Sequence, residues 1–139
     1  MGRAGRRALR LVVDTSLLMC CVEDRKALEE LVVESFERPV EIIVPDAVLR
    51  ELAGIARNRG RRGALARIAL EEVRRMAAEG RCKVVEAGEG DVDSLLIRLA
   101  KELGAYIASA DEKLRHKARS LGVGEVAYLK AQKRLSPLP

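Results

Sequence analysis

The sequence predicts an α/β fold, a three-layer α/β/α sandwich in which helices cover both faces of a five-stranded parallel sheet. Short β-branched runs alternate along the chain with longer segments whose apolar residues recur at spacings of three and four. The 139 residues are 48% hydrophobic and 34% charged, which is typical of one globular domain. Alternating strands and helices imply parallel strands joined by helical crossovers.

The five predicted strands are short apolar runs that end at a turn residue or a proline. The first ends at Asp14, and the second is stopped by Pro45. Their nearly continuous apolar character indicates strands that are buried on both faces. In chain order they span residues 9–13, 40–44, 83–85, 105–108 and 126–129.

Helices are predicted between these strands from stripes of apolar residues. Asp46 and Asp111 stand where a helix N-cap is expected, and Gly80, Gly104 and Gly122 stand where helices should end. A basic loop, residues 57–63, separates the second stripe from the third. The stripes are Leu28, Leu31, Val32 and Phe36; Val48, Leu52 and Ile55; Leu65, Ile68, Ala69, Val73 and Met76; Leu95, Leu96, Leu99 and Leu103; and Leu114, Ala118 and Leu121.

Composition narrows the classes of function. The formal net charge of +5 favours a polyanionic partner, although a basic protein with solvated helix faces fits the charge equally well. Three cysteines, two of them adjacent, do not form a disulfide framework. Because His116 is the only histidine, neither a zinc site nor a Ser-His-Asp triad is expected.

Residues 1–139 are expected to form a single domain with a basic N-terminal arm at about 1–8 and a short C-terminal tail at about 131–139. The N-terminus lacks the apolar stretch of a secretory signal, and no apolar run approaches the length that spans a membrane. These features predict a cytoplasmic protein that makes no membrane contact.

Acidic residues gather at one predicted edge of the sheet. Asp14 follows the first strand, Asp111 follows the fourth, and Asp93 lies in the first turn of the helix before the fourth strand. Ligands of open parallel sheets bind beyond the carboxyl ends of the strands. Asp93 and Asp111 taken singly are better explained as residues that cap a helix or favour the helix dipole, so the argument depends on the acids converging.

Glu51 is the fourth acid. It falls three residues after Val48 and four before Ile55, so it is predicted on the buried-facing side of its helix, where a carboxylate needs compensation by a cation. Carboxylates and water are the ligands that Mg²⁺ prefers. Together the four acids predict metal-assisted hydrolysis of phosphodiester bonds.

These residues resemble the motifs of PIN domains. Residues 11–16, Leu-Val-Val-Asp-Thr-Ser, are similar to the opening strand of that family, and residues 44–52 are similar to its second motif, with Glu51 at the acidic position. Residues 93–96 resemble the third motif, and residues 109–114 resemble the fourth, with Ser109 where Thr is common and Ala110 where Asn is common. The resemblance covers about residues 9–130.

The resemblance implies an Mg²⁺- or Mn²⁺-dependent nuclease that acts on RNA. Asp14, Glu51, Asp93 and Asp111 would be the catalytic acids, and Asp14, Asp93 and Asp111 would hold the metal. Ser16 would contribute its hydroxyl, with Ser109 in a supporting position. Many family members have an acid directly before the third motif; Val92 stands there in this chain, and Asp91 partly substitutes or only starts the helix. The family is often dimeric, so a homodimer is expected.

A cluster of arginines is the predicted RNA-binding element. Its members lie in the basic loop, and they are Arg57, Arg59, Arg61 and Arg62. The planar guanidinium suits phosphate, although a solubilising loop has the same composition.

The favoured hypothesis is therefore a metal-dependent endoribonuclease. One form of this hypothesis is a VapC-type toxin, which would have an antitoxin protein as partner. A nuclease that processes ribosomal RNA and a non-catalytic scaffold that binds RNA or protein are the alternatives. A phospho-acceptor receiver domain is disfavoured because the third strand ends in Glu86 rather than in an acceptor aspartate.

Overall fold

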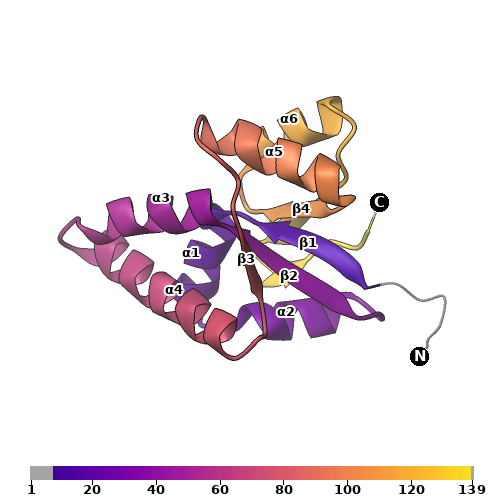
Figure 1. The fold of residues 1–139 in the computed structure, drawn as a ribbon. Coiled ribbons are helices and arrows are strands. Elements are labelled where there is room, and N and C mark those ends of the chain that lie inside the picture. The colour runs from indigo at the N-terminus through magenta and orange to yellow at the C-terminus, as the bar shows by residue number, and fades with distance from the viewer. Residues whose placement is uncertain (1–7, 139) are drawn as a thin grey trace.

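The computed structural model describes residues 8–138, so residues 1–7 of the expected N-terminal arm lie outside it. The described chain alternates strands and helices (Figure 1). The strands are β1 (Leu9–Val13), β2 (Val40–Pro45), β3 (Lys83–Val85), β4 (Tyr106–Ser109), β5 (Glu125–Leu129) and β6 (Arg134–Leu135). The helices are α1 (Thr15–Glu23), α2 (Leu28–Ser35), α3 (Asp46–Ala56), α4 (Arg61–Ala78), α5 (Val92–Leu103) and α6 (Glu112–Ser120).

The sheet has the strand order β3-β2-β1-β4-β5-β6. The five predicted strands are parallel to one another, which confirms the predicted fold class. From β1 the chain first builds outward through β2 to β3, and it then returns to place β4 on the other side of β1. The order therefore reverses between β1 and β4, and the carboxyl ends of these two strands flank the crevice where ligands of such sheets bind.

The strand count of five was wrong, because β6 adds a sixth strand. Leu135 pairs with Tyr128 in an antiparallel arrangement, so part of the predicted C-terminal tail belongs to the sheet. A strand of two residues is too short to show a periodic pattern in the sequence. Lys133, which has a φ of 51°, lies in the turn that reverses the chain.

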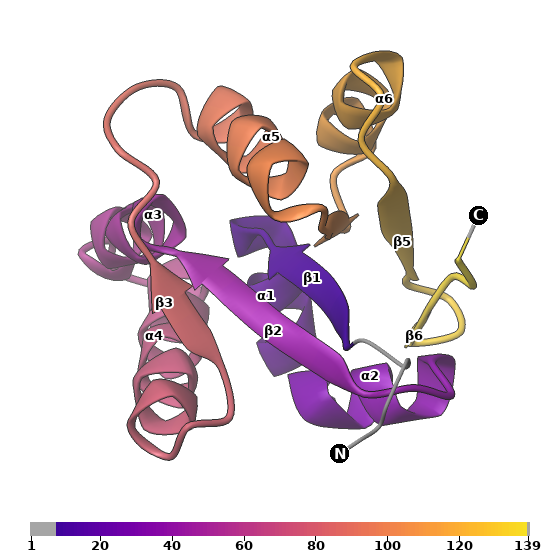
Figure 2. The ribbon, with the colours of Figure 1, turned by 45° about the vertical axis from the view of Figure 1, so that its right-hand side comes forward.

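Helices cover the sheet in two unequal layers (Figure 2). One face is covered by α5, which contacts β1 and β4, and by α6, which contacts β4 and β5. The other face carries α1 and α2, with α4 packed against α1. Helices α3 and α4 pack against each other as a hairpin that projects beyond the β3 side of the sheet (Figure 1), and α3 reaches both α1 and α5 at the carboxyl edge.

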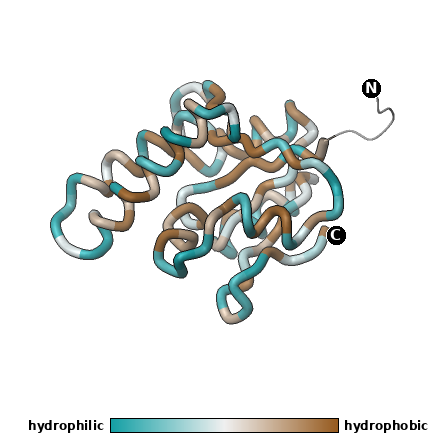
Figure 3. Tube along the Cα trace, turned by 90° about the horizontal axis from the view of Figure 1, so that it is seen from below, coloured by the Kyte–Doolittle hydropathy of each residue, from teal (hydrophilic) through white to brown (hydrophobic). Residues whose placement is uncertain are grey.

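The core lies in the central strands and the helix faces turned toward them. Val12, Val13, Val44 and Ile107 are fully buried, because strands with a helix layer on each side have no solvated face. Figure 3 shows hydrophobic residues along these strands and a hydrophilic tip on the α3–α4 hairpin. No helix within residues 8–138 is both long and apolar enough to cross a membrane.

Two helix starts differ from the prediction. Helix α1 begins directly after β1 and has no counterpart among the predicted stripes, because Leu17, Leu18 and Met19 are buried at consecutive positions and leave no spacing of three and four. Helix α4 begins at Arg61, inside the predicted basic loop of residues 57–63. Only residues 57–60 of that segment therefore form a loop. Gly60, with a φ of 91°, allows this tight connection.

Asp46 was predicted as the cap of α3, and this was wrong. The N-cap position belongs to Pro45, and Asp46 is the first helical residue. Its carboxylate instead accepts a hydrogen bond from the Ala87 N–H at 2.9 Å and pairs with Arg50 at 3.1 Å. The backbone hydrogen bond from Ala87, more than the pairing with Arg50, lowers the pKa of Asp46.

Candidate functional site

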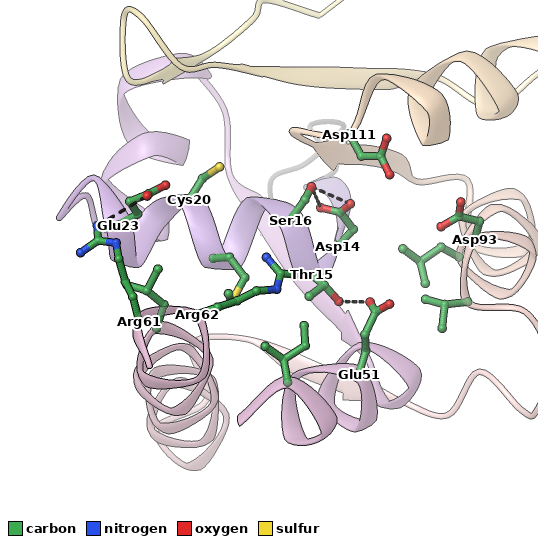
Figure 4. A pocket seen from close by; sticks show the side chains of 15 residues that line it. Asp14, Thr15, Ser16, Cys20, Glu23, Glu51, Arg61, Arg62, Asp93 and Asp111 are labelled. Atoms are coloured by element: carbon green, nitrogen blue, oxygen red, sulfur yellow. Dashed lines mark hydrogen bonds and ion pairs between the residues drawn. The ribbon is translucent and has the colours of Figure 1, made fainter. Parts of the chain in front are cut away.

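A cleft of about 550 Å³ opens at the carboxyl edge of the sheet. It is bounded by α1, α3, the start of α4, the start of α5 and the β4–α6 turn. Figure 4 shows Asp14, Glu51, Asp93 and Asp111 on one side of this cleft, and Arg61, with Glu23 beside it, on the other. The lining residues are Asp14, Thr15, Ser16, Met19, Cys20, Glu23, Glu51, Ile55, Arg61, Arg62, Leu65, Val92, Asp93, Leu96 and Asp111.

Asp14 is the innermost acid, with only 6% of its surface exposed. It follows β1 directly and caps α1, because its Oδ1 accepts a hydrogen bond from the Leu17 N–H at 3.0 Å. Burial raises the pKa of Asp14 from 3.8 to about 6, with a further small increase from the negative charge of Asp111. The hydrogen bonds that the carboxylate accepts oppose this rise without cancelling it.

Two serines hold the Asp14 carboxylate in place. The buried Ser109 hydroxyl donates to Asp14 Oδ2 at 2.6 Å and accepts a hydrogen bond from the Asp111 N–H at 2.8 Å. The Ser16 hydroxyl lies 2.9 Å from both carboxylate oxygens and accepts from the Ala110 N–H at 3.0 Å. The ends of β1 and β4 are therefore tied together through side chains, so both predicted supporting serines lie at the site.

Asp111 and Asp93 face the same cleft on the side of Asp14 (Figure 4). Asp111 caps α6 by accepting from the Lys113 N–H at 2.9 Å, so the cap interpretation and the site interpretation both hold for it. Asp93 is half-buried in the first turn of α5. Burial raises the pKa of Asp93, and the negative charges of Asp111 and Asp91 raise it further.

Asp91 does not line the cleft. It caps α5 by accepting from both the N–H and the hydroxyl of Ser94 at 3.0 Å, and it lies 3.9 Å from Lys117. Hydrogen bonds from Ser94 lower the pKa of Asp91. Asp91 therefore serves as the N-cap of α5, and its only effect on the site is that its negative charge raises the pKa of Asp93.

Glu51 reaches the cleft, but the prediction that it points to the buried side of α3 was wrong, because its side chain is exposed. Val48 and Leu52 face the core, whereas Glu51 lies on the flank of α3 that borders the open cleft. The Thr15 hydroxyl donates a hydrogen bond to Glu51 Oε1. Solvent and Thr15 therefore stabilise this carboxylate in place of a buried cation.

Only half of the predicted arginine cluster reaches the cleft. Arg61 and Arg62 line it because they belong to the first turn of α4, which packs beside α1. Arg57 and Arg59 are exposed near the tip of the hairpin and do not line it. The earlier start of α4 separates the two pairs.

Thr15 and Glu23 are polar lining residues that the sequence interpretation missed. Thr15 stands between Asp14 and Ser16, so a helix recognised as starting there would have pointed to it. Glu23, at the end of α1, lies 3.5 Å from Arg61. It carried no signal in the sequence, because its place at the cleft depends on the packing of α4 against α1.

The donor set suits a hard divalent cation. Besides Glu23, the cleft is lined by the carboxylates of Asp14, Glu51, Asp93 and Asp111 and by the hydroxyls of Thr15 and Ser16. Oxygen ligands are those that Mg²⁺ and Mn²⁺ prefer. Burial is the main cause of the raised pKa values of Asp14 and Asp93, and the negative charge of Asp111 raises both further. Within residues 8–138, no three His, Cys, Asp or Glu side chains lie close enough together to form a ready-made metal cluster, and Mg²⁺ usually binds through one or two carboxylates and keeps several waters.

Comparisons with known proteins agree with this architecture. A family described as "PIN like domain" matches residues 11–132. The fold is similar to that of the PIN domain endonuclease Utp24, with a TM-score of 0.72 and 20% identity over 93% of this chain and 92% of that chain. It is also similar to a domain of a functionally unknown protein from Methanocaldococcus jannaschii DSM 2661, with a TM-score of 0.64 and 22% identity over 86% and 91% of the two chains.

None of the curated proteins matches this chain. The two structural likenesses, both below 25% identity, concern the fold alone. The family match is of a different kind because it spans most of the sequence, from the middle of β1 to the turn after β5. Both sheet halves and every acid of the cleft lie inside it, and on this match the chain belongs to the family of PIN-like domains.

Proposed function

We propose that this protein is a metal-dependent endoribonuclease that hydrolyses RNA phosphodiester bonds in the cleft at the carboxyl edge of the sheet. The observation that carries the proposal is the meeting of Asp14, Glu51, Asp93 and Asp111 from four elements around one cleft. Membership of the PIN-like family and a fold shared with an endonuclease support it.

Asp14, Asp93 and Asp111 are the residues that would hold Mg²⁺ or Mn²⁺. A bound divalent ion supplies positive charge at the phosphate and at the leaving oxygen and makes water a stronger nucleophile. Ser109 and Ser16 fix the orientation of the Asp14 carboxylate. Thr15 likewise orients Glu51, which lies at the rim where it can accept a proton from water.

Arg61 and Arg62 would bind the RNA backbone beside the acids. Arg62 extends from α4 toward the middle of the cleft (Figure 4), and it has no carboxylate partner among residues 8–138. A guanidinium that is not paired is available for a phosphate oxygen. The four acids weaken the binding of a polyanion until a cation neutralises them, so metal and RNA are expected to bind with positive coupling. Without metal, RNA is expected to bind more weakly, through the arginines.

Mn²⁺-dependent cleavage of a mixed pool of structured and single-stranded RNA tests the proposal, with wild type compared with Asp111→Asn. The substitution keeps the size of the side chain and removes one negative charge from the cleft. We expect cutting that requires metal, stops in chelator and is lost in Asp111→Asn. Full activity in chelator would contradict the mechanism.

A non-catalytic scaffold is the other outcome of this experiment. It would bind RNA or protein without cutting, and it would show no Mn²⁺ binding by the wild type. Wild type that binds Mn²⁺ but cuts nothing in the pool would instead indicate a narrow target, such as a single site in a ribosomal RNA precursor.

The antitoxin partner and the homodimer stay predictions. Light scattering on the purified protein checks the dimer. Co-expression with a small protein encoded beside it checks the antitoxin, which should copurify and suppress cutting. A nuclease that processes ribosomal RNA needs no such partner.

A further inference from the structure

The basic side of the cleft contains one carboxylate, Glu23. This residue ends α1, lines the cleft and lies 3.5 Å from Arg61. Its other oxygen, Oε1, accepts a hydrogen bond from Lys130 Nζ at 3.0 Å. Glu23 therefore pairs with two cations, one on α4 and one just after β5.

Lys130 is anchored next to the cleft by a second acid. Its Nζ lies 3.2 Å from Asp24 Oδ1, and Asp24 Oδ2 accepts a 2.5 Å hydrogen bond from the Tyr128 hydroxyl. Cys20 lines the cleft, and the positive charge of Lys130 opposes the rise in the pKa of its thiol that burial causes. Lys130 is thus a third cation beside Arg61 and Arg62, although the sequence pattern does not group it with them.

The pairing of Arg61 with Glu23 is loose. The side chains of Arg61 and Glu23 are 73% and 40% exposed, and exposed ion pairs contribute little because water screens them. A phosphate oxygen can therefore replace Glu23 as the partner of Arg61 at low cost. Until that exchange, the negative charge of Glu23 lies where the RNA backbone would have to pass.

We propose that Glu23 is an exchangeable counter-ion: it holds Arg61 and Lys130 in the free protein and competes with the RNA backbone for both. The inference rests on the proposed function, because it takes RNA as the ligand of the cleft. Glu23 therefore influences the affinity for RNA, whereas the four acids of the proposed function carry out the cleavage. Weakening the competition should tighten RNA binding, because Arg61 then becomes free to bind phosphate and Lys130 keeps only Asp24 as its partner.

Binding of a labelled single-stranded RNA oligonucleotide, measured by fluorescence anisotropy in chelator, tests the proposal. The variants are Glu23→Gln, Arg61→Ala and the double variant, with Glu34→Gln as the matched control. Glu34→Gln changes the net charge by the same amount as Glu23→Gln. Glu34 pairs with Lys26 at 3.2 Å and does not line the cleft, so only the position of the lost charge differs. Low ionic strength keeps the difference between surface charges measurable.

We expect Glu23→Gln to bind RNA about two- to fivefold more tightly than wild type, and Glu34→Gln to bind it as wild type does. In the Arg61→Ala background most of this increase in affinity should disappear, because the two residues act as one unit. The salt dependence of binding should steepen in Glu23→Gln by about 0.7 for each further phosphate that the protein neutralises.

Equal affinities of Glu23→Gln and Glu34→Gln would overturn the proposal, as would an increase in affinity that persists undiminished in Arg61→Ala. RNA binding by none of the variants would overturn it too. The cleavage assay with Mn²⁺ is independent of this measurement, which needs no cutting. Failure of the nuclease proposal therefore shows as absent cleavage, and failure of the present one shows as unchanged affinity.

Discussion

Asp14 keeps a carboxylate in a buried position that accepts hydrogen bonds from Ser109, Ser16 and the Leu17 N–H. Its pKa still rises from 3.8 to about 6, because burial outweighs these bonds. The folded protein therefore binds this proton more tightly than the unfolded chain does. The resulting stabilisation is complete at a pH below 3.8 and is lost as the pH rises through about 6. The shift corresponds to about 3 kcal/mol.

Replacement of Asp14 by Asn should remove this pH dependence. In chelator, the free energy of unfolding of the wild type should fall by up to about 3 kcal/mol more than that of Asp14→Asn between acid and neutral pH. The comparison uses the change in the free energy of unfolding with pH. A difference in stability between the two proteins that does not depend on pH therefore cancels. Denaturant titrations at several pH values measure it. Parallel pH profiles of the two proteins would show that Asp14 titrates normally.

Ser109 links the two central strands at the site, so Ser109→Ala should affect both stability and cutting. It leaves Asp14 Oδ2 and the Asp111 N–H without their shared hydroxyl, which should cost about 1–3 kcal/mol of unfolding free energy. Mn²⁺-dependent cleavage should fall by about tenfold, because a metal ligand loses its orienting partner. Ser120→Ala, whose exposed hydroxyl bonds to a helix carbonyl, is the control. Equal rates in the two variants would contradict the role given to Ser109.

The residues of the site differ in how far the sequence could reveal them. Asp14 and Asp111 were predictable, because the carboxyl ends of parallel strands share one edge of the sheet. Glu51 was placed in the correct element but on the wrong flank, since spacing along α3 does not show where a cleft begins. Glu23 and Thr15 could not be found, because both depend on α1.

At the scale of elements, the central strands were readable from the sequence because their burial on both faces gives continuous apolar runs. Helix α1 could not be recognised from the sequence. It is also buried around much of its circumference, so its apolar residues form no stripe with helical spacing. Ile68 fits the apolar stripe of α4, yet it is 49% exposed, because it lines a second cavity, of about 430 Å³, between α4 and residues of α1 and α2. Tertiary packing decided each of these cases.

The α3–α4 hairpin brings Arg61 and Arg62 to the cleft, and two glycines test its packing. A Cβ on Gly63 would lie 1.9 Å from the carbonyl oxygen of Asn58, whereas a Cβ on Gly54 would meet nothing within 4 Å. Gly63→Ala should therefore destabilise the fold by about 1–3 kcal/mol, and Gly54→Ala should stabilise it by about 0.5–1 kcal/mol. Denaturant unfolding measures both. A neutral Gly63→Ala would mean that the hairpin turn relaxes freely.

Strand β6 can be tested through Leu135, which is 1% exposed and lies where β6 contacts α2. Leu135→Ala should lower the free energy of unfolding by about 2–5 kcal/mol, the usual cost of a cavity at a buried leucine. Leu121→Ala removes the same atoms from a side chain that is 47% exposed, so it should change stability little. Similar values for both variants would show that the C-terminal segment is a detachable tail.

At the scale of the whole molecule, the cleft lies between β1 and β4, where the order in which strands are added to the sheet reverses. Asp14 and Asp111 come from the ends of the adjacent strands β1 and β4, Asp93 comes from one helical layer, and Glu51 comes from α3 at the edge. The acids therefore connect parts of the chain that pack on different faces of the sheet. Their mutual repulsion is a strain that the fold carries whenever no cation is present.

Mn²⁺ should consequently stabilise the entire fold and not only the site. At a metal concentration of about one hundred times the dissociation constant, a ligand that binds only the folded state adds about 2.7 kcal/mol, which should appear as a higher melting temperature. In Asp111→Asn this stabilisation should largely vanish. Glu102→Gln, at an exposed position of α5 outside the cleft, carries the same change of charge and should keep the full stabilisation. Equal thermal shifts in all three proteins would mean that Mn²⁺ binds to surface acids, and that the charges around the cleft are balanced by solvent alone.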